Sequence, residues 1–276
     1  MAEPIVIGVA LREDDRAPLA LGLELVRFMG APLALAHVFA YDAPSPVSAD
    51  AETAALEGVA LLAMASVAQS LGDDLEVTLH AEPSTSRVRG LRAAAAKLDA
   101  ALLVVGASHR GPVGRVVPGA TTERLIHAAP CALAVAPNDY RPGPGGIRSI
   151  GVAFADTAEG LEALDAAAAM AALGGATLTI YTAVAEQATA QRIPAGVAGD
   201  VKPLEGDAAE ALSAVSGELD LMVCGSRGFG TLHGALVGSV SAALAHSCEC
   251  PLLVLPRERR ADVRAAVPSR PESVGV

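Results

Sequence analysis

Five glycines and three serines lie close together in the stretch CGSRGFGTLHGALVGSVS, residues 224–241. Glycine loses much conformational entropy on ordering, so such a cluster indicates a sharply turning backbone or a group that approaches it closely. The stretch follows the apolar run LMV and leads into a helical pattern that starts near Gly238. A helix start offers unpaired N–H groups and partial positive charge, which suit a phosphate. The loop therefore predicts a phosphate site; a tight loop without a ligand is the alternative.

Each residue type in this loop would have its own task. Glycines let the backbone approach the anion, serine hydroxyls donate hydrogen bonds, and an arginine adds positive charge. The candidate residues are Gly225, Arg227, Gly228, Gly238, Ser239 and Ser241.

The chain contains a tandem repeat. Residues 104–137 match residues 223–256 at a constant separation of 119 positions, whereas IGVAL at 7–11 matches IGVAF at 150–154 at a separation of 143. The second copy therefore has 143 − 119 = 24 fewer residues between its first strand and its glycine loop. The predicted organisation is a first domain at 1–138, a Pro- and Gly-rich linker at 139–148, a second domain at 149–256 and a tail at 257–276.

Within each copy, short apolar runs alternate with helical patterns, which is typical of a doubly wound parallel α/β sheet. Strands are expected at 5–11, 33–39, 75–80, 101–106, 132–137, 149–155, 177–183, 221–225 and 251–256, with a further short strand within 200–207. Helices are expected at 16–29, 50–71, 84–98, 119–128, 158–173, 207–216 and 238–247. Each copy ends in an apolar strand at a sheet edge, and we expect the two edges to pair inside the chain.

Composition narrows the function classes. The formal net charge is −11, and Lys97 and Lys202 are the lysines, so the basic face that a nucleic-acid partner needs is missing. The N-terminus does not read as a signal peptide, and we expect no membrane span, so the prediction is a soluble cytoplasmic protein. The four cysteines lack metal-ligand spacing and are predicted to be free thiols.

The pattern G-x2-G-x9-G-S, fitted by Gly225, Gly228, Gly238 and Ser239 and followed by the strand CPLLVLP, resembles the universal stress protein family. The resemblance covers nearly the whole chain as two copies. It implies two tandem Rossmann-like domains, each with strand order 3-2-1-4-5, and adenine-nucleotide binding in members that keep the motif. It also implies pairing through the last strand, and further homodimerisation of the chain is left open.

Carried over to this sequence, the resemblance implies that the second copy holds ATP, with or without Mg²⁺. The motif residues would wrap the ribose and the phosphates, joined by Cys224 and by Val240 at the helix start. Adenine would lie against the ends of the first two strands, near Ala153, Ala155, Asp156 and Ala183. The family usually has Asp at the position of Ala155, so Asp156 would have to substitute by a local shift.

The first copy departs further from the motif. Gly106 and Gly119 are retained, but His109 stands where the second glycine is expected and Ala120 replaces the hydroxyl residue. Thr121 could still donate to an anion, although a helix-capping role for it and for Thr122 is preferred. This copy is predicted to be a weakened site.

The sequence supports a nucleotide-binding stress-response regulator or sensor best. The alternatives are a nucleotide-free scaffold that acts through protein contacts, with a regulatory partner that the sequence does not identify, and a slow ATPase. Efficient phosphoryl transfer is disfavoured because no Walker lysine follows the glycines. No catalytic residue and no resident metal ion is predicted.

Overall fold

The computed structural model describes residues 2–11, 16–41, 49–72, 75–108, 113–183, 193–194, 196–226 and 239–256. Strands and helices alternate along the chain, as the apolar pattern predicts. The N-terminal half, as used below, consists of β1 Ile5–Gly8, α1 Arg16–Met29, β2 Leu33–Phe39, α2 Ala49–Gln69, β3 Val77–Pro83, α3 Arg87–Lys97, β4 Leu102–Gly106, α4 Ala120–Ala128 and β5 Ala132–Ala136. The C-terminal half consists of β6 Ser149–Ala153, α5 Ala158–Gly174, β7 Thr177–Ala183, β8 Asp200–Leu204, α7 Ala208–Ser216, β9 Leu221–Gly225, α8 Ser239–Ser247 and β10 Leu252–Leu255.

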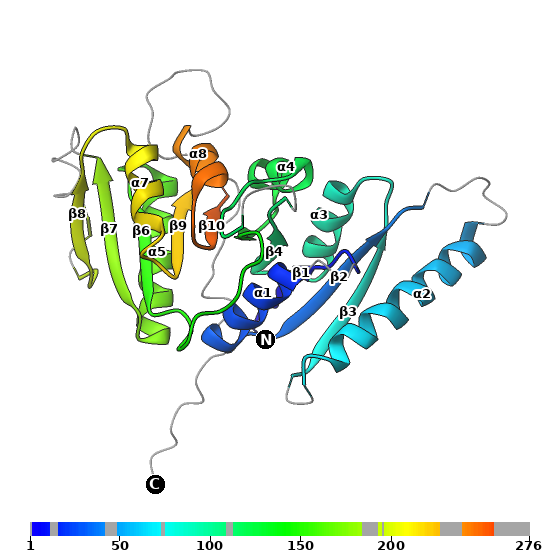
Figure 1. The fold of residues 1–276 in the computed structure, drawn as a ribbon. Coiled ribbons are helices and arrows are strands. Elements are labelled where there is room, and N and C mark those ends of the chain that lie inside the picture. The colour runs from blue at the N-terminus through cyan, green and yellow to red at the C-terminus, as the bar shows by residue number, and fades with distance from the viewer. Residues whose placement is uncertain are drawn as a thin grey trace, which may run out of the picture.

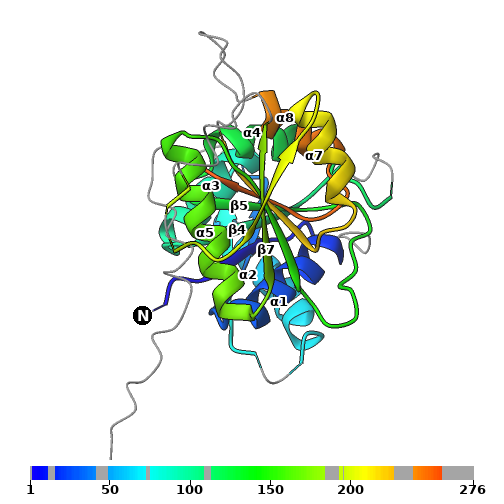
Figure 2. The same cartoon turned by 90° about the vertical axis from the view of Figure 1, so that its left-hand side faces the viewer.

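All ten of these strands form one sheet, in the order β3-β2-β1-β4-β5-β10-β9-β6-β7-β8 (Figure 1). Within each half the pairing is parallel, and each half shows the predicted 3-2-1-4-5 order. Figure 2, seen after a quarter turn, shows the strands fanned by the twist that such sheets adopt. The predicted α/β fold class is confirmed.

The two halves meet where β5 pairs antiparallel with β10. Ala134 lies opposite Leu253, its own counterpart 119 positions later, so a pseudo-twofold axis passes between these two residues. Beside this ladder, the Val116 amide donates to the Cys248 carbonyl at 2.8 Å. The edge-to-edge pairing predicted from the apolar last strands is confirmed, while the domain and linker boundaries stay predictions.

Two hydrophobic layers cover the sheet. On one face α1, α2 and α5 pack through residues such as Leu25, Met64 and Leu164. On the other face α3, α4, α7 and α8 pack through residues such as Leu125 and Leu244. Small alanine side chains in the helices let the backbones approach the sheet closely.

The alignment of the two first strands requires a correction. Ile5 lies opposite Leu102, and Ile150 lies opposite Leu221, which is the counterpart of Leu102 at the 119-residue separation. The structural separation of β1 and β6 is therefore 150 − 5 = 145 rather than 143. The repeated Ile-Gly dipeptides therefore lie two residues apart when the two halves of the sheet are aligned by their hydrogen-bond register, which depends on the packing of whole strands. Because the shift is an even number of residues, each side chain stays on the same face of the sheet.

Helix α2 departs from the expectation that no segment could span a membrane. Among the described residues, α2 is one helix that is long and apolar enough to span a membrane, over Ala51–Gln69. A single helix of this kind is weak evidence for a membrane span. It packs against β2 and β3 through Ala60 and Met64. Glu52 and Glu57 interrupt its apolar sequence only near its start.

Candidate functional site

A pocket of about 320 Å³ opens at the carboxyl ends of the strands in the N-terminal half. In open α/β sheets this edge is where ligands bind. Residues from the ends of β1, β2 and β4 and from the starts of α3 and α4 form its wall. They are Gly8, Val9, Ala10, His37, Val38, Arg87, Leu91, Val105, Gly106, Ala107, Ser108, Gly119, Ala120, Thr121 and Thr122.

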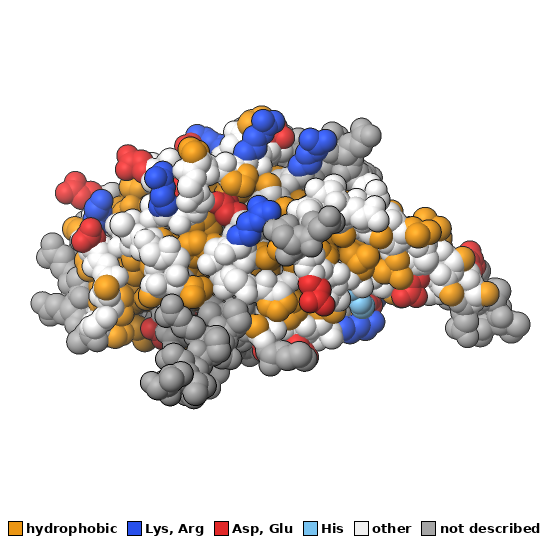
Figure 3. Space-filling view, turned by 90° about the horizontal axis from the view of Figure 1, so that it is seen from below, with side chains coloured by type: hydrophobic (Ala, Val, Ile, Leu, Met, Phe, Trp, Pro, Cys, Tyr) orange, Lys and Arg blue, Asp and Glu red, His pale blue; other side chains and the backbone are white. Residues whose placement is uncertain are grey.

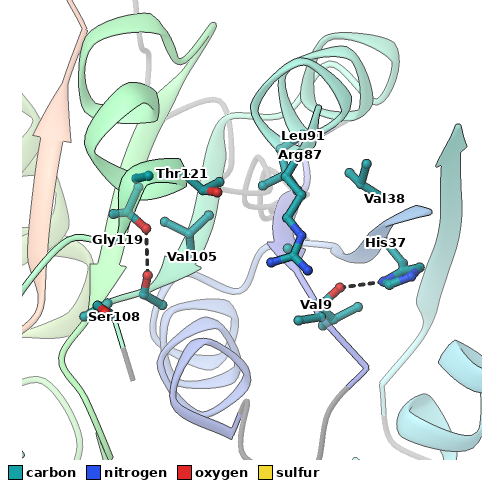
Figure 4. A pocket seen from close by; sticks show the side chains of 15 residues that line it. Val9, His37, Val38, Arg87, Leu91, Val105, Ser108, Gly119 and Thr121 are labelled. Carbon is teal, nitrogen blue, oxygen red and sulfur yellow. Dashed lines mark hydrogen bonds between the residues drawn. The ribbon is translucent and has the colours of Figure 1, made fainter. Parts of the chain in front are cut away.

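One side of this pocket is closed by His37 from β2. Its Nδ1–H donates to the Val9 carbonyl at 2.8 Å, so β1 and β2 are tied together just beyond their ladder (Figure 4). This bond fixes the ring, and Nε2 is then an acceptor in the neutral tautomer. A polar ring nitrogen thus stands among the apolar side chains Val9 and Val38.

The pocket is also lined by Arg87, the first residue of α3. Ser86 caps this helix by accepting from the Arg89 amide at 3.4 Å. Figure 4 shows the Arg87 side chain extending from α3 toward Val9. The guanidinium supplies a positive group at the mouth of the pocket, and none of the described lining residues is acidic.

Close packing shapes the floor of the pocket. A Cβ placed on Gly8 would lie 2.9 Å from Leu91 Cδ2, so the absence of a side chain at Gly8 lets α3 lie directly over β1. Leu91 is 8% exposed and forms part of the apolar wall with Val105. The result is an apolar slot that has a cationic side.

Helix α4 begins beside this slot. Its N-cap residue is Gly119, which makes no side-chain capping bond, so its first N–H groups lack both an intrahelical partner and a capping side chain. Ser108 holds the preceding loop through its amide, which donates to the Val117 carbonyl at 2.6 Å. Thr121 lines the slot, and its donation to an anion stays a prediction.

The capping role preferred for the two threonines is not observed. The Thr122 hydroxyl donates 2.8 Å back to the Gly106 carbonyl and is 4% exposed, so it ties the first turn of α4 to the end of β4. Gly119 occupies the cap position instead. His109, proposed to fill the place of the second motif glycine, lies outside the described residues.

In the C-terminal half the predicted base-binding residues come together only partly. Ala153 ends β6 beside Cys224 of β9, at 3% exposure each, and Ala183 ends β7 on the other side. Ala155 follows, buried at 4%, whereas Asp156 is exposed at the start of the turn into α5. The carboxyl ends of β6, β7 and β9 thus meet as the parallel order requires.

Gly225 has a packing role in the fold. A Cβ on this residue would lie 2.8 Å from the carbonyl oxygen of Glu159, in the first turn of α5. The close approach of α5 therefore requires glycine at position 225, whether or not a phosphate binds there. Arg227, Gly228 and Gly238 lie outside the described residues.

The start of α8 contributes one polar group that points inward. Ser241 is 1% exposed, and its hydroxyl donates to the Ser226 carbonyl at 3.0 Å. It occupies the position of Thr122, 119 residues earlier, and performs the same task of tying the helix to the preceding strand end. Val240 is buried at 4%, and Ser239 is the first residue of the helix.

All four cysteines are free, as predicted, and the structure shows that they are buried. Burial raises the pKa of the Cys224 thiol. Cys248 and Cys250 lie with their Sγ atoms 3.6 Å apart, and this contact lowers the pKa of Cys248 and raises that of Cys250. The described residues contain no group of three or more His, Cys, Asp or Glu that could hold a metal ion.

Sequence reasoning missed His37 and Arg87. Two signals were available: His37 stands near the end of an expected strand, and Arg87 follows the serine-rich stretch SerThrSer at 84–86, which is typical of a helix start. Neither residue belongs to the glycine motif, so neither was selected.

These features place the protein in the class of doubly wound α/β proteins whose ligand pocket lies beyond the carboxyl ends of the strands. The universal stress protein family matches residues 1–137 and 183–256. The chain belongs to the universal stress protein family.

Similar proteins extend this result. A universal stress protein of Mycobacterium tuberculosis is 24% identical over 91% of this chain and 99% of its own length. The crystal structure of a universal stress protein from Archaeoglobus fulgidus superposes with a TM-score of 0.70 at 15% identity, over 93% of this chain and 99% of that one. A functionally unknown protein from Pseudomonas aeruginosa gives a TM-score of 0.63 at 16% identity, over 96% of both chains. Both structures therefore share the fold along nearly their whole length.

Proposed function

We propose that this protein binds ATP or a related adenine nucleotide and acts as a regulatory sensor in a stress response, in the cytoplasm. The observation that carries the proposal is the pocket of about 320 Å³ beyond β1, β2 and β4. Its volume falls in the range of small-molecule sites, about 300–1,000 Å³.

The chemistry of the pocket fits a nucleotide. Val9, Val38, Leu91 and Val105 offer apolar surface for a base, and His37 supplies a ring nitrogen that can pair with it. Arg87 offers a bidentate cation for phosphate. The start of α4 also lines the pocket and is a source of N–H donors. Because the described lining residues include no carboxylate, a Mg²⁺ ion here would be held by phosphates and water.

The C-terminal half is proposed as the tighter site. It keeps Gly225, Gly228, Gly238 and Ser239 of the motif in its sequence, and the carboxyl ends of β6, β7 and β9 lie side by side in the sheet. The N-terminal half, in which His109 and Ala120 interrupt the motif, is proposed as the weaker site. Its Arg87 compensates in part for the missing glycine and hydroxyl.

The direct test is mass spectrometry of the purified protein under native conditions and again after denaturation. We expect an adenine nucleotide of defined mass to accompany the native protein and to be released by denaturation. A control preparation of the Gly228→His, Arg87→Ala double variant should contain none. Wild-type protein that neither retains nor takes up ATP, ADP or AMP would contradict the proposal and favour a nucleotide-free scaffold.

A further inference from the structure

Helix α2 exposes three large apolar side chains: Leu62 on the side that faces away from the sheet, Val59 on its flank, and Leu56 in line with the buried Ala60 and Met64. Leu62 is 75% exposed, Val59 66% and Leu56 38%, and these are three of the six exposed large hydrophobic residues in the described part of the chain. Figure 3 shows hydrophobic side chains along the projecting arm to which α2 belongs. Monomeric proteins seldom keep such a concentration uncovered.

The outward face of α2 has a regular spacing. The positions on this face that have the heptad spacing of a helix packing along another helix are occupied by four small residues, one leucine and one glutamine. They are Ala51, Ala55, Gly58, Leu62, Ala65 and Gln69. This seam lies opposite the inward residues Ala60 and Met64, which are buried against the sheet.

Gly58 in the middle of this seam has no explanation within the chain. A Cβ added there would meet no atom within 4 Å, and its φ is not positive. Glycine inside a helix costs about 1 kcal/mol relative to alanine. A gap of this kind on an exposed apolar face is filled when a side chain from outside the chain enters it.

We propose that α2 is an interface through which two copies of this chain associate, with their α2 helices antiparallel. The seam is self-complementary about its midpoint at residue 60. An antiparallel pair places Leu62 of each copy against Gly58 of the other and Ala55 against Ala65, so a large residue meets a gap and small residues meet each other. An isologous dimer requires this kind of reciprocal match.

The charges of α2 favour an antiparallel pair of helices over a parallel pair and over a membrane surface. The charged residues of α2 are acidic and all precede Gly58, so an antiparallel pair places them against the uncharged end of the partner helix. A parallel pair would align acid with acid and would leave Gly58 facing Gly58. A membrane surface is a poor fit, because α2 contains no Lys or Arg and the net charge of −11 is repelled by anionic lipid.

Sedimentation velocity of the full chain over a range of concentrations tests the association, with the Leu62→Asp variant as the disruptive change. Each dimer loses two buried leucines, so we expect the dissociation constant to rise by about a hundredfold or more. The matched control is Val113→Asp, which changes a residue of similar exposure, 71%, away from α2. Wild-type protein that stays monomeric at millimolar concentration, or a control that dissociates equally, would overturn the proposal.

The Gly58→Leu variant distinguishes this specific packing from non-specific hydrophobic association. Leucine raises helix propensity and apolar surface, so a merely sticky patch or a parallel pair would associate more strongly. In the antiparallel pair the new leucine collides with Leu62 of the other copy, and we expect weaker association with an unchanged circular dichroism spectrum. Stronger association would contradict the antiparallel register.

Cysteine cross-linking measures the register directly. We expect a mixture of the Ala55→Cys and Ala65→Cys variants to form a covalent dimer containing one copy of each under mild oxidation. Either variant alone should stay uncross-linked, and the four native cysteines are buried. Efficient cross-linking of Ala55→Cys with itself would indicate a parallel pair and overturn the arrangement.

Discussion

The two halves of this chain keep the same sheet but differ in what they place at its carboxyl edge. Strand order is identical, and Ala134 and Leu253 face each other across a pseudo-twofold axis. At the edge, the position of His37 is taken by Thr182 under the structural separation of 145, and the helix after the third strand begins with Arg87 in one half and Ala208 in the other. The halves thus share a scaffold while their site chemistry has diverged.

Under the proposed function, the two halves would form an anion site on the same fold in two different ways. The C-terminal half keeps a glycine motif, in which backbone groups would approach the ligand. The N-terminal half combines a formed pocket with a long cationic side chain. Backbone positions change little after duplication because strand pairing and packing fix them, whereas edge residues contribute less to folding and are free to vary.

The largest expected effect on ATP affinity comes from exchanging Gly228 and its counterpart His109 between the two halves. Gly228→His places a Cβ and an imidazole where a phosphate would approach, and we expect the tight site to weaken by more than about a hundredfold. Calorimetric titration with ATP measures this change. The reciprocal variant His109→Gly should strengthen the weaker site. Two equal tight sites in the wild type, or tight binding that survives Gly228→His, would refute the proposed asymmetry.

A smaller effect on ATP affinity is expected for Arg87→Ala. It is measured in the Gly228→His background, so that binding by the N-terminal half alone is observed. Loss of one charged hydrogen-bonding partner costs about 1.5–3 kcal/mol, so we expect ATP affinity to fall roughly ten- to a hundredfold. Arg92→Ala is the matched control, because Arg92 is exposed on the same helix and does not line the pocket. Equal losses in both variants would show that the effect is general electrostatics.

The smallest effect concerns stability. Glu82 of β3, 6% exposed, accepts from Lys97 Nζ at 2.8 Å and bonds His80 at 2.9 Å, whereas the corresponding position in β8 is the buried Leu204. The Lys97 side chain is 58% exposed, and an ion pair that is open to water on one side contributes little to stability. We expect the double variant Glu82→Leu, Lys97→Met to change the unfolding free energy at neutral pH by at most about 1 kcal/mol.

The pH dependence of unfolding distinguishes this pair from a purely structural contact. Burial opposes ionisation of Glu82, but hydrogen bonds from Lys97 and His80 outweigh it and hold the pKa of Glu82 below its usual value. The stabilisation is present above the ordinary carboxyl pKa and is lost as pH falls through the lowered value. Urea unfolding of wild type should therefore weaken relative to the double variant on acidification. Parallel profiles for the two proteins would exclude this contribution.

The sequence by itself determined the duplication, most of the element positions and the pairing of the last strands. The run TLTIYTA gave the bounds of β7 without error, because it is rich in β-branched residues and follows the turn signal Gly174-Gly175. The apolar strands CALAVAP and CPLLVLP had to be covered at a sheet edge, and antiparallel pairing of β5 with β10 covers both. Local chemistry and the need to bury apolar edges were sufficient for these features.

Only the tertiary structure decided which side chains share the pocket. His37 and Arg87 stand fifty positions apart and meet because parallel strands bring the ends of β1 and β2 and the start of α3 to one edge. The two-residue shift between β1 and β6 and the inward bonds of Thr122 and Ser241 likewise depend on how strands and helices pack. Register and side-chain direction are set by contacts between distant segments, and no local sequence pattern encodes them.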